Sequence, residues 1–215
     1  MISPARHTRP IEPDRQSQII EAALKLIARN GSHNVSIQDI ATEARISKGA
    51  VLHYFPTKEE LFASAFREFF HQFFERTKNT MAQHDDPLQK LRCIGDWLFD
   101  ENDATVRMGY PLYLECMSRA LYEKLFHRLF HDWVTSWIDL LRDAIEEGIR
   151  RGCFKSDINP EDTARAISAF CQGVASRWYL DRDHHLTAWA RDTLKNYTEG
   201  LLWKKRGEIP NIDRT

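Results

Sequence analysis

Apolar residues recur at helical spacing along most of the chain, and no segment shows the strict alternation of a half-buried strand. In the first such segment, from Asp14 onwards, one helix face collects Ile20, Ala23, Leu24 and Ile27. Asn30-Gly31 follows and supplies the left-handed turn that commonly ends a helix. We therefore predict a first helix between about residues 14 and 30.

Two short helices follow, each with a recognisable start. Ser36 precedes the second helix and has Asp39 three residues later, which approximates a capping box. Ser47 can cap the third helix, and Pro56 ends it because proline cannot continue a helix. The short connection through Arg45-Ile46 gives the pair the arrangement of a helix-turn-helix motif, in which the second helix is presented to the major groove of DNA.

The rest of the chain predicts longer helices. Thr57 caps a fourth helix that runs to about Met81, before the break at Asp85-Asp86-Pro87. Further helices are expected near residues 87–102, 104–118, 120–151, 160–181 and 185–205. The fold class is therefore all-α, with about nine helices. We divide it into an N-terminal arm (1–13), a three-helix helix-turn-helix head (14–62), a larger helical body for ligand binding and dimerisation (63–205) and a C-terminal tail (206–215).

Charge is distributed unevenly between these parts. The 215 residues carry 30 basic and 31 acidic side chains, so contact with a polyanion must be local. Residues 1–58 hold eight Lys and Arg against five Asp and Glu, a net charge of +3, which leaves −4 for the remainder. A basic head on an acidic body suits DNA binding by the head.

The composition also excludes several classes of protein. No apolar run approaches the ~20 residues of a membrane span, and the N-terminus lacks the apolar centre of a secretory signal, so we expect a cytoplasmic protein. The four cysteines (Cys93, Cys116, Cys153 and Cys171) are far apart and form no Cys-x-x-Cys pair. We expect reduced thiols rather than a disulfide framework or a zinc ribbon.

The helix-turn-helix segment carries a specific pattern, Ile40-Ala41-x-x-Ala44-x-Ile46-Ser47-x-Gly49-x-Val51-x-x-Tyr54-Phe55-x-x-Lys58-x-x-Leu61. This pattern resembles the N-terminal signature of the TetR family of transcriptional regulators, over roughly residues 15–62. The body resembles the family only in its length, its helix count and the turn Glu147-Gly148-x-x-x-Gly152-x-Phe154. The resemblance implies a dimeric, ligand-responsive regulator, most often a repressor that a small molecule releases from a pseudo-palindromic operator.

Two positions depart from the family's usual pattern. Arg45 stands where a glycine is common in the turn, and Leu52 stands where a phosphate-contacting tyrosine is common. The missing tyrosine leaves a second hypothesis open, namely a helical small-molecule binding protein whose head does not engage DNA.

Residue chemistry assigns candidate DNA contacts. Lys58 and the backbone amides near Thr57 suit phosphate, because a helix N-terminus adds its dipole to the lysine charge. Lys48 can donate to guanine, Gln38 to adenine, and Ala50 can meet a thymine methyl group. The full candidate set is Gln38, Ser47, Lys48, Gly49, Ala50, His53, Tyr54, Thr57 and Lys58.

The last two predicted helices read as a dimerisation unit. The first has a stripe of small residues, which permits close helix approach: Ala166, Ala169, Gly173 and Ser176. The matching face of the second includes Leu194, Tyr197 and Leu201. Two subunits could thus form a four-helix interface with two-fold symmetry, although both stripes could also pack inside one chain.

The middle helices are rich in aromatic residues, and we expect most of them to be core residues. An apolar pocket among them would nevertheless suit a small-molecule effector, and aromatic faces suit a cationic or planar one. Our candidates are Tyr113, Glu115, Trp133, Trp137 and Trp178. His127 and His131 lie four residues apart, but no third ligand is placed with them, so we predict neither a metal site nor a cofactor. The chain has no phosphate loop, dinucleotide fingerprint or nucleophile elbow, so we do not expect an enzyme.

Overall fold

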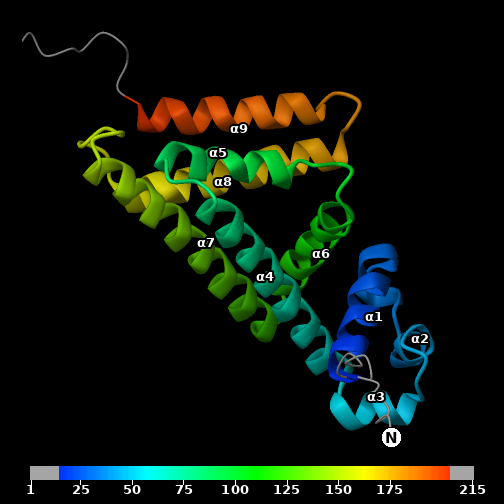
Figure 1. The fold of residues 1–215 in the computed structure, drawn as a ribbon. Coiled ribbons are helices and arrows are strands. Elements are labelled where there is room, and N and C mark those ends of the chain that lie inside the picture. Colours follow the sequence, from blue (N-terminus) through cyan, green and yellow to red (C-terminus); the bar gives the residue numbers. More distant parts are fainter. Residues whose placement is uncertain (1–14, 204–215) are drawn as a thin grey trace, which may run out of the picture. The chain divides into compact units, whose positions relative to one another are not determined.

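The computed structural model describes residues 15–203, and all regular secondary structure in that range is helical (Figure 1). In chain order the helices are α1 (Arg15–Asn30), α2 (Ile37–Glu43), α3 (Lys48–Tyr54), α4 (Lys58–Ala82), α5 (Pro87–Leu98), α6 (Ala104–Ala120), α7 (Lys124–Arg150), α8 (Pro160–Leu180) and α9 (Thr187–Leu202), with a 3-10 turn at Ser32–Asn34. The all-α fold class is confirmed over this range. The predicted arm (1–13) and tail (206–215) lie outside the described residues.

The chain divides between Glu68 and Phe69 into two compact units, which we call the head and the body. We had placed this division after residue 62. Helix α4 begins in the head and continues into the body, so one uninterrupted helix joins the two units.

Side-chain caps start the short helices of the head. The Ser36 hydroxyl accepts from the amide of Asp39 at 3.2 Å, and the Asp39 carboxylate accepts from the amide of Ser36 at 2.8 Å, which completes the capping box. The Ser47 hydroxyl accepts from the amide of Ala50 at 3.1 Å and caps α3. Gly31 has φ 74°, the left-handed conformation expected after α1. The predicted starts of α2 and α3 are therefore confirmed by the hydrogen bonds of Ser36 and Ser47.

The turn between α2 and α3 contains Arg45, whose φ of 55° is left-handed. A side chain costs about 1 kcal/mol in this conformation, which is why glycine suits the position. The turn is held by a hydrogen bond from the amide of Ile46 to the carbonyl of Ala41 at 2.9 Å. The angle between α2 and α3 is thus fixed despite the missing glycine.

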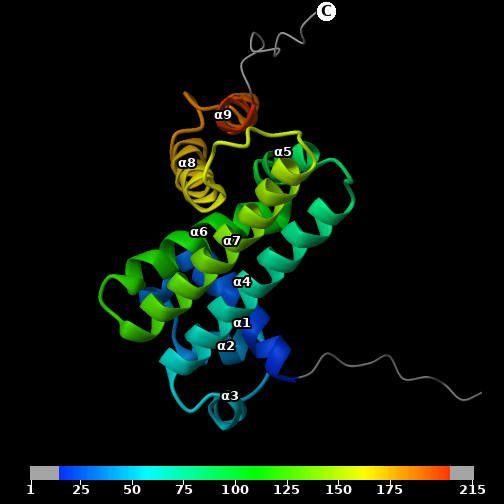
Figure 2. The same ribbon diagram turned by 90° about the vertical axis from the view of Figure 1, so that its left-hand side faces the viewer.

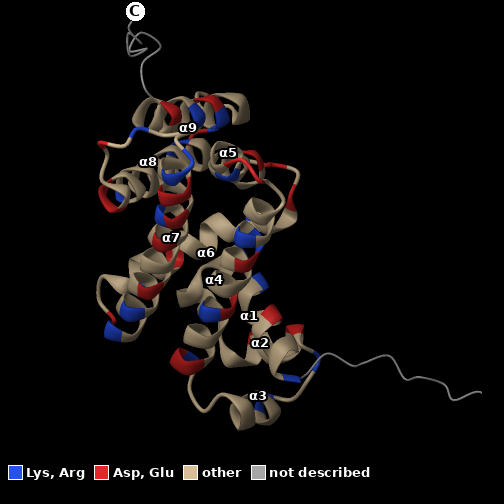
Figure 3. Ribbon diagram, turned by 60° about the vertical axis from the view of Figure 1, so that its left-hand side comes forward, with Lys and Arg blue, Asp and Glu red and all other residues tan. Residues whose placement is uncertain are grey.

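In the body, α9 lies alongside α8 and α5, and α7 packs against α5, α6 and α8 (Figures 1 and 2). One apolar cluster fills the space among α5, α7 and α8, with Leu91, Leu141 and Ile167 among its members. A second surrounds Trp178 and includes Phe99, Val174 and Leu194. Acidic and basic residues alternate along the outside of α7, where Arg142 pairs with Asp139 at 2.6 Å (Figure 3).

The break between α6 and α7 differs from our prediction. We expected it at Ser118-Arg119, but α6 continues to Ala120 and the turn falls at Leu121–Glu123. Arg119 stays helical because its guanidinium bridges the turn. It pairs with Glu123 at 2.7 Å and lies 3.7 Å from the centre of the Phe126 ring.

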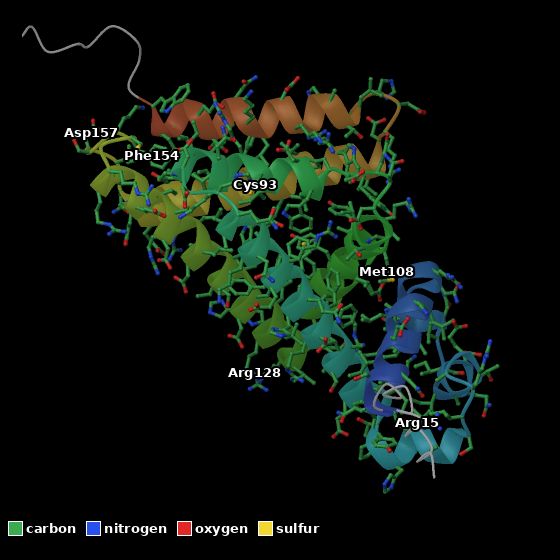
Figure 4. The ribbon with its side chains drawn as sticks, viewed as in Figure 1. Arg15, Cys93, Met108, Arg128, Phe154 and Asp157 are labelled. Carbon is green, nitrogen blue, oxygen red and sulfur yellow. The ribbon has the colours of Figure 1, made fainter. Side chains whose placement is uncertain are left out.

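The turn after α7 explains the pattern Glu147-Gly148-x-x-x-Gly152-x-Phe154. Gly152 has φ 73°, and the amides of Cys153 and Phe154 both reach back to the carbonyl of Gly148, at 2.9 and 3.2 Å. This return lays the Phe154 ring directly over Gly148 (Figure 4). Glu147 fixes the same corner through ion pairs with Lys90 and Arg151, both at 2.5 Å.

We predict that Gly148→Ala destabilises the fold by about 1–3 kcal/mol, because the added methyl group overpacks the corner. Its Cβ would lie 2.1 Å from the Phe154 ring, and that ring is only 3% exposed and has little room to move. Gly200→Ala in α9 is the matched control, since its Cβ meets nothing within 4 Å. The control should gain about 0.5–1 kcal/mol from helix propensity alone. Urea unfolding followed by circular dichroism measures both, and equal midpoints for the two variants would contradict the packing argument.

Candidate DNA-binding surface and ligand cavity

Helix α3 has one buried side and one open side. Val51 is fully buried together with Ile40 and Ala41 of α2, and Ile46 of the turn is half-buried. These four residues form the apolar wedge between the helices. The opposite side exposes Lys48, Gly49, His53 and Tyr54, together with Leu52. The wedge thus presents one polar face of α3 at a fixed angle, as major-groove reading requires.

The other candidate DNA contacts lie at helix starts in the same unit. Gln38 and Ser47 are exposed at the starts of α2 and α3, and Ala50 is half-exposed. The Thr57 hydroxyl accepts from the amide of Glu60 at 3.1 Å, which leaves its own proton free to be donated.

Lys58 opens α4, and its ammonium is 5.1 Å from the centre of the Phe62 ring. Its charge contributes to a lowered pKa of Asp39, whose main cause is the hydrogen bond from Ser36. The lysine charge and the amides of the first turn of α4 reinforce each other toward an anion.

The body contains an internal cavity of about 70 Å³. On the scale where one water takes about 10–15 Å³, it has room for roughly five to seven waters. Its walls come from α4, α5, α6, α7 and α8, and nine of the lining residues are aromatic: Phe69, Phe70, Phe73, Trp97, Tyr110, Tyr113, Trp133, Trp137 and Trp178. Such a concave, aromatic-lined space inside a helical body is typical of a small-molecule site.

The rings form a continuous network. Trp133 stacks on Phe70 with ring centroids 4.7 Å apart. Tyr113 contacts the Trp133 ring edge-on, with centroids 5.5 Å apart. Phe73 lies 4.8 Å from Trp97 and 5.6 Å from Trp137. The side chains of α4 are thus an integral part of the cavity wall.

Two polar side chains of the wall, Tyr110 and Trp178, donate hydrogen bonds within the body. The Tyr110 hydroxyl donates to Ser176 at 2.5 Å, and the Trp178 indole donates to Thr187 at 3.1 Å. The indole N–H groups of Trp97 and Trp133 are buried and meet no acceptor among the described residues. Burial also raises the pKa of Tyr113 far above its usual value, so this phenol stays protonated.

Four predicted ligand-binding residues, Tyr113, Trp133, Trp137 and Trp178, line this cavity. Glu115 does not; it lies elsewhere on α6, and the lining contains no Asp or Glu. Sequence reasoning missed Phe69, Phe70, Phe73, Trp97 and Tyr110 as wall residues. The phenylalanine spacing along α4 was visible, but spacing alone does not distinguish a core helix from a cavity wall.

The predicted dimer residues are placed in different environments. Ala169 and Gly173 are exposed on α8, and a Cβ at Gly173 would meet nothing within 4 Å. Ala166 is half-buried, and Ser176 is turned inward to Tyr110.

On α9, Leu194 lies in the core rather than on the surface, within the apolar cluster around Trp178. Tyr197 stacks on Phe170 at 3.8 Å, and Leu201 packs against the first apolar cluster. The stripe of small residues on α8 is therefore solvent-exposed at Ala169 and Gly173, whereas the candidate residues of α9 pack mainly within the chain.

The histidines and cysteines show no reactive arrangement. His127 and His131 are both exposed, and no group of three metal-binding side chains occurs within residues 15–203. Burial raises the pKa of the Cys116 and Cys171 thiols to about 12, which keeps them in the unreactive thiol form. Among the helices of the described range, none is both long and apolar enough to cross a membrane.

Comparison with protein families places both parts of the chain. Residues 19–65 match the family model of bacterial regulatory proteins of the tetR family, and residues 87–202 match the model of the C-terminal domain of BetI-type transcriptional repressors. The HTH-type transcriptional regulator BetI of Yersinia pestis (strain Pestoides F) is 33% identical over 94 residues, which are 43% of this chain and 48% of that protein. The chain spans 27% to 48% of the length of the first curated relatives that it matches.

Solved structures match over nearly the whole chain. A transcriptional regulator from Saccharomonospora viridis in complex with choline has a TM-score of 0.82 at 22% identity, covering 90% of this chain and 100% of that one. The regulator FadR from Bacillus subtilis in complex with stearoyl-CoA has a TM-score of 0.71 at 24% identity, covering 86% and 98%. At these identities the likeness shows a common fold.

Proposed function

The chain belongs to the TetR family of bacterial regulatory proteins, with a body of the BetI type, and we propose that it is a dimeric repressor released from its operator by a small molecule. One observation carries the proposal. Helix α4 begins with Lys58 next to the reading helix and, within the same helix, supplies Phe69, Phe70 and Phe73 to the cavity wall. A ligand in the body therefore touches the helix that also ends at the DNA. We place this activity in the cytoplasm, where the DNA lies.

The proposed effector is a small quaternary ammonium compound. Aromatic faces attract such a cation through the negative charge of their π-systems, by about 0.5–2 kcal/mol per ring when desolvated, and the cavity is walled by nine rings. The choline complex of the S. viridis regulator supports this class.

Selection from a pool of random duplexes tests the DNA-binding part of the proposal. A dimer with two reading helices should enrich a pseudo-palindrome whose half-sites are about 34–36 Å apart. The double variant Lys48→Ala, Lys58→Ala is the reference. Enrichment by the wild-type protein that is no better than this reference would reject DNA binding and favour the second hypothesis, a helical small-molecule binding protein.

We predict different losses for different head residues. Lys58→Ala should weaken binding to all duplexes alike and lower the salt slope of log K by about one, because it removes a phosphate contact. Lys48→Ala and Gln38→Ala should each cost about 1–3 kcal/mol at particular base pairs. Fluorescence anisotropy on operator and random duplexes over a salt series measures both effects. Equal losses on both kinds of DNA for all three variants would contradict this division of roles.

We predict that Gly173→Leu weakens the dimer without destabilising the monomer. The added side chain meets open space within its own chain, and leucine is the better helix former by nearly 1 kcal/mol. The leucine side chain would clash only with a helix of the partner subunit that packs closely against α8. Sedimentation velocity over a concentration series, with thermal melting alongside, reads out both properties. Ala82→Leu at the exposed end of α4 is the control, and an unchanged dimer for Gly173→Leu would place the interface elsewhere.

We predict reciprocal coupling between effector and operator. If choline weakens operator affinity by some factor within the usual range of about 5 to 150, operator DNA must weaken choline affinity by the same factor. Calorimetric titration of choline with and without operator measures the second factor, and anisotropy measures the first. Choline affinity that is indifferent to operator would show that choline is not the effector. Loss of the coupling, but not of either binding, in Phe73→Leu would locate the link in α4.

A further inference from the structure

The hydroxyl and amide groups of the cavity wall are confined to two helices. Helices α4, α5 and α7 line the cavity with phenylalanine, tryptophan and leucine alone. Helices α6 and α8 add Thr105, Tyr110, Tyr113 and Gln172. Among the described residues that line the cavity, only Thr105 is exposed, and Tyr110 and Gln172 are half-buried. The polar and most exposed part of the wall therefore lies on α6 and α8.

The Tyr110 side chain crosses from α6 to α8. Its hydroxyl donates to that of Ser176 at 2.5 Å, and the centre of its ring lies 4.7 Å from that of Tyr179. Ser176 and Tyr179 are three residues apart in α8, so both lie on the same side of that helix. Tyr110 lines the cavity, whereas Ser176 and Tyr179 do not. Tyr110 thus fastens α6 to α8 at the edge of the cavity.

Ser176 is oriented to accept this hydrogen bond. Its own hydroxyl donates to the carbonyl of Gln172 at 2.8 Å, one turn earlier in α8. Because a hydroxyl has one proton and two lone pairs, an acceptor position is left for Tyr110. The hydroxyl proton of Tyr110 is therefore used between two helices and not toward the cavity.

The backbone next to Tyr110 lacks one helical hydrogen bond. Pro111 follows Tyr110 inside α6 and has no N–H. The carbonyl of Arg107, four residues before the proline, cannot receive the bond that another residue would donate from this position. Helix α6 is thus weakened at the point where Tyr110 fastens it to α8.

We propose that effectors enter the cavity between α6 and α8, and that Tyr110 closes this entrance through its hydrogen bond with Ser176. This inference rests on the proposed function, because it takes the cavity as the effector site. Opening requires the bond to break and the Tyr110 ring to leave Tyr179. The bond therefore sets how often the entrance is open, and with it the rates of entry and exit rather than the affinity.

The reactivity of Cys171 measures access to the cavity without any effector. Cys171 lines the cavity and is 5% exposed, whereas Cys93 is 6% exposed and lies outside the wall. We expect Tyr110→Phe and Ser176→Ala each to speed the labelling of Cys171 by methyl methanethiosulfonate, a small neutral reagent. The expected factor is about two to ten, the effect of losing one neutral hydrogen bond. Mass spectrometry of peptides follows both thiols, and labelling of Cys93 should stay unchanged.

Tyr113→Phe is the matched control. It removes a hydroxyl from the same helix and the same wall but leaves the bond between Tyr110 and Ser176 in place, so it should leave both labelling rates unchanged. Unchanged labelling of Cys171 in either test variant would overturn the proposed entrance. An equal rise at Cys93, which would report a general loosening of the body, or an equal effect of Tyr113→Phe would do the same.

The binding kinetics of tetramethylammonium separate this inference from the proposed function. In stopped-flow tryptophan fluorescence, Tyr110→Phe should speed association and dissociation by the same factor and change the affinity by less than about twofold. A faster dissociation alone would make the hydroxyl a ligand contact and overturn the entrance. If neither tetramethylammonium nor choline binds while the labelling of Cys171 responds as expected, the ammonium effector is rejected and the entrance is supported.

Discussion

Helix α4 crosses the boundary between two apolar cores, so its sequence must satisfy both. In the head, Leu61 and Phe66 are fully buried. Beyond Glu68 the helix continues in the body, where Phe70 stacks on Trp133 and the Phe73 ring lies tilted against Trp97 with centroids 4.8 Å apart. A helix with large side chains packed in each unit cannot shift in one of them without cost, because close-packed cores have few alternative arrangements. This constraint is the reason why the proposed function assigns the coupling between cavity and DNA to α4.

The cavity is an unfilled volume in the body core, which lowers the stability of the fold until a ligand occupies it. At about 24 cal/mol per Å³, an empty space of this size costs on the order of 1–2 kcal/mol. The unpaired indoles of Trp97 and Trp133 add to that cost. A ligand that fills the space would recover part of the cost of the cavity. The residues that weaken the core are therefore those that would give the ligand its affinity.

Local features of the fold could be read from the sequence, whereas features that depend on distant helices could not. Ser36, Asp39 and Ser47 act within one helical turn, so their caps follow from spacing alone. The start of α7 was misplaced because an ion pair of Arg119 holds the preceding turn in α6. Leu194 looked like an interface residue, but it packs in the core with Val174 of α8 and Trp97 of α5. Likewise, the phenylalanines of α4 became cavity residues only through the positions of α5 to α8.

The departure at Leu52 affects how firmly the head would hold DNA. Leu52 is exposed on α3 and can donate nothing to a phosphate, whereas the tyrosine common at this position in the family can. One neutral hydrogen bond contributes about 0.5–1.5 kcal/mol, so a dimer that lacks two loses about 1–3 kcal/mol. Coupling free energies between effector and operator are usually of this same size. Under the proposed function, reduced operator affinity would lower the ligand concentration needed for release, and Lys58 and Lys48 would carry a larger share of the remaining affinity.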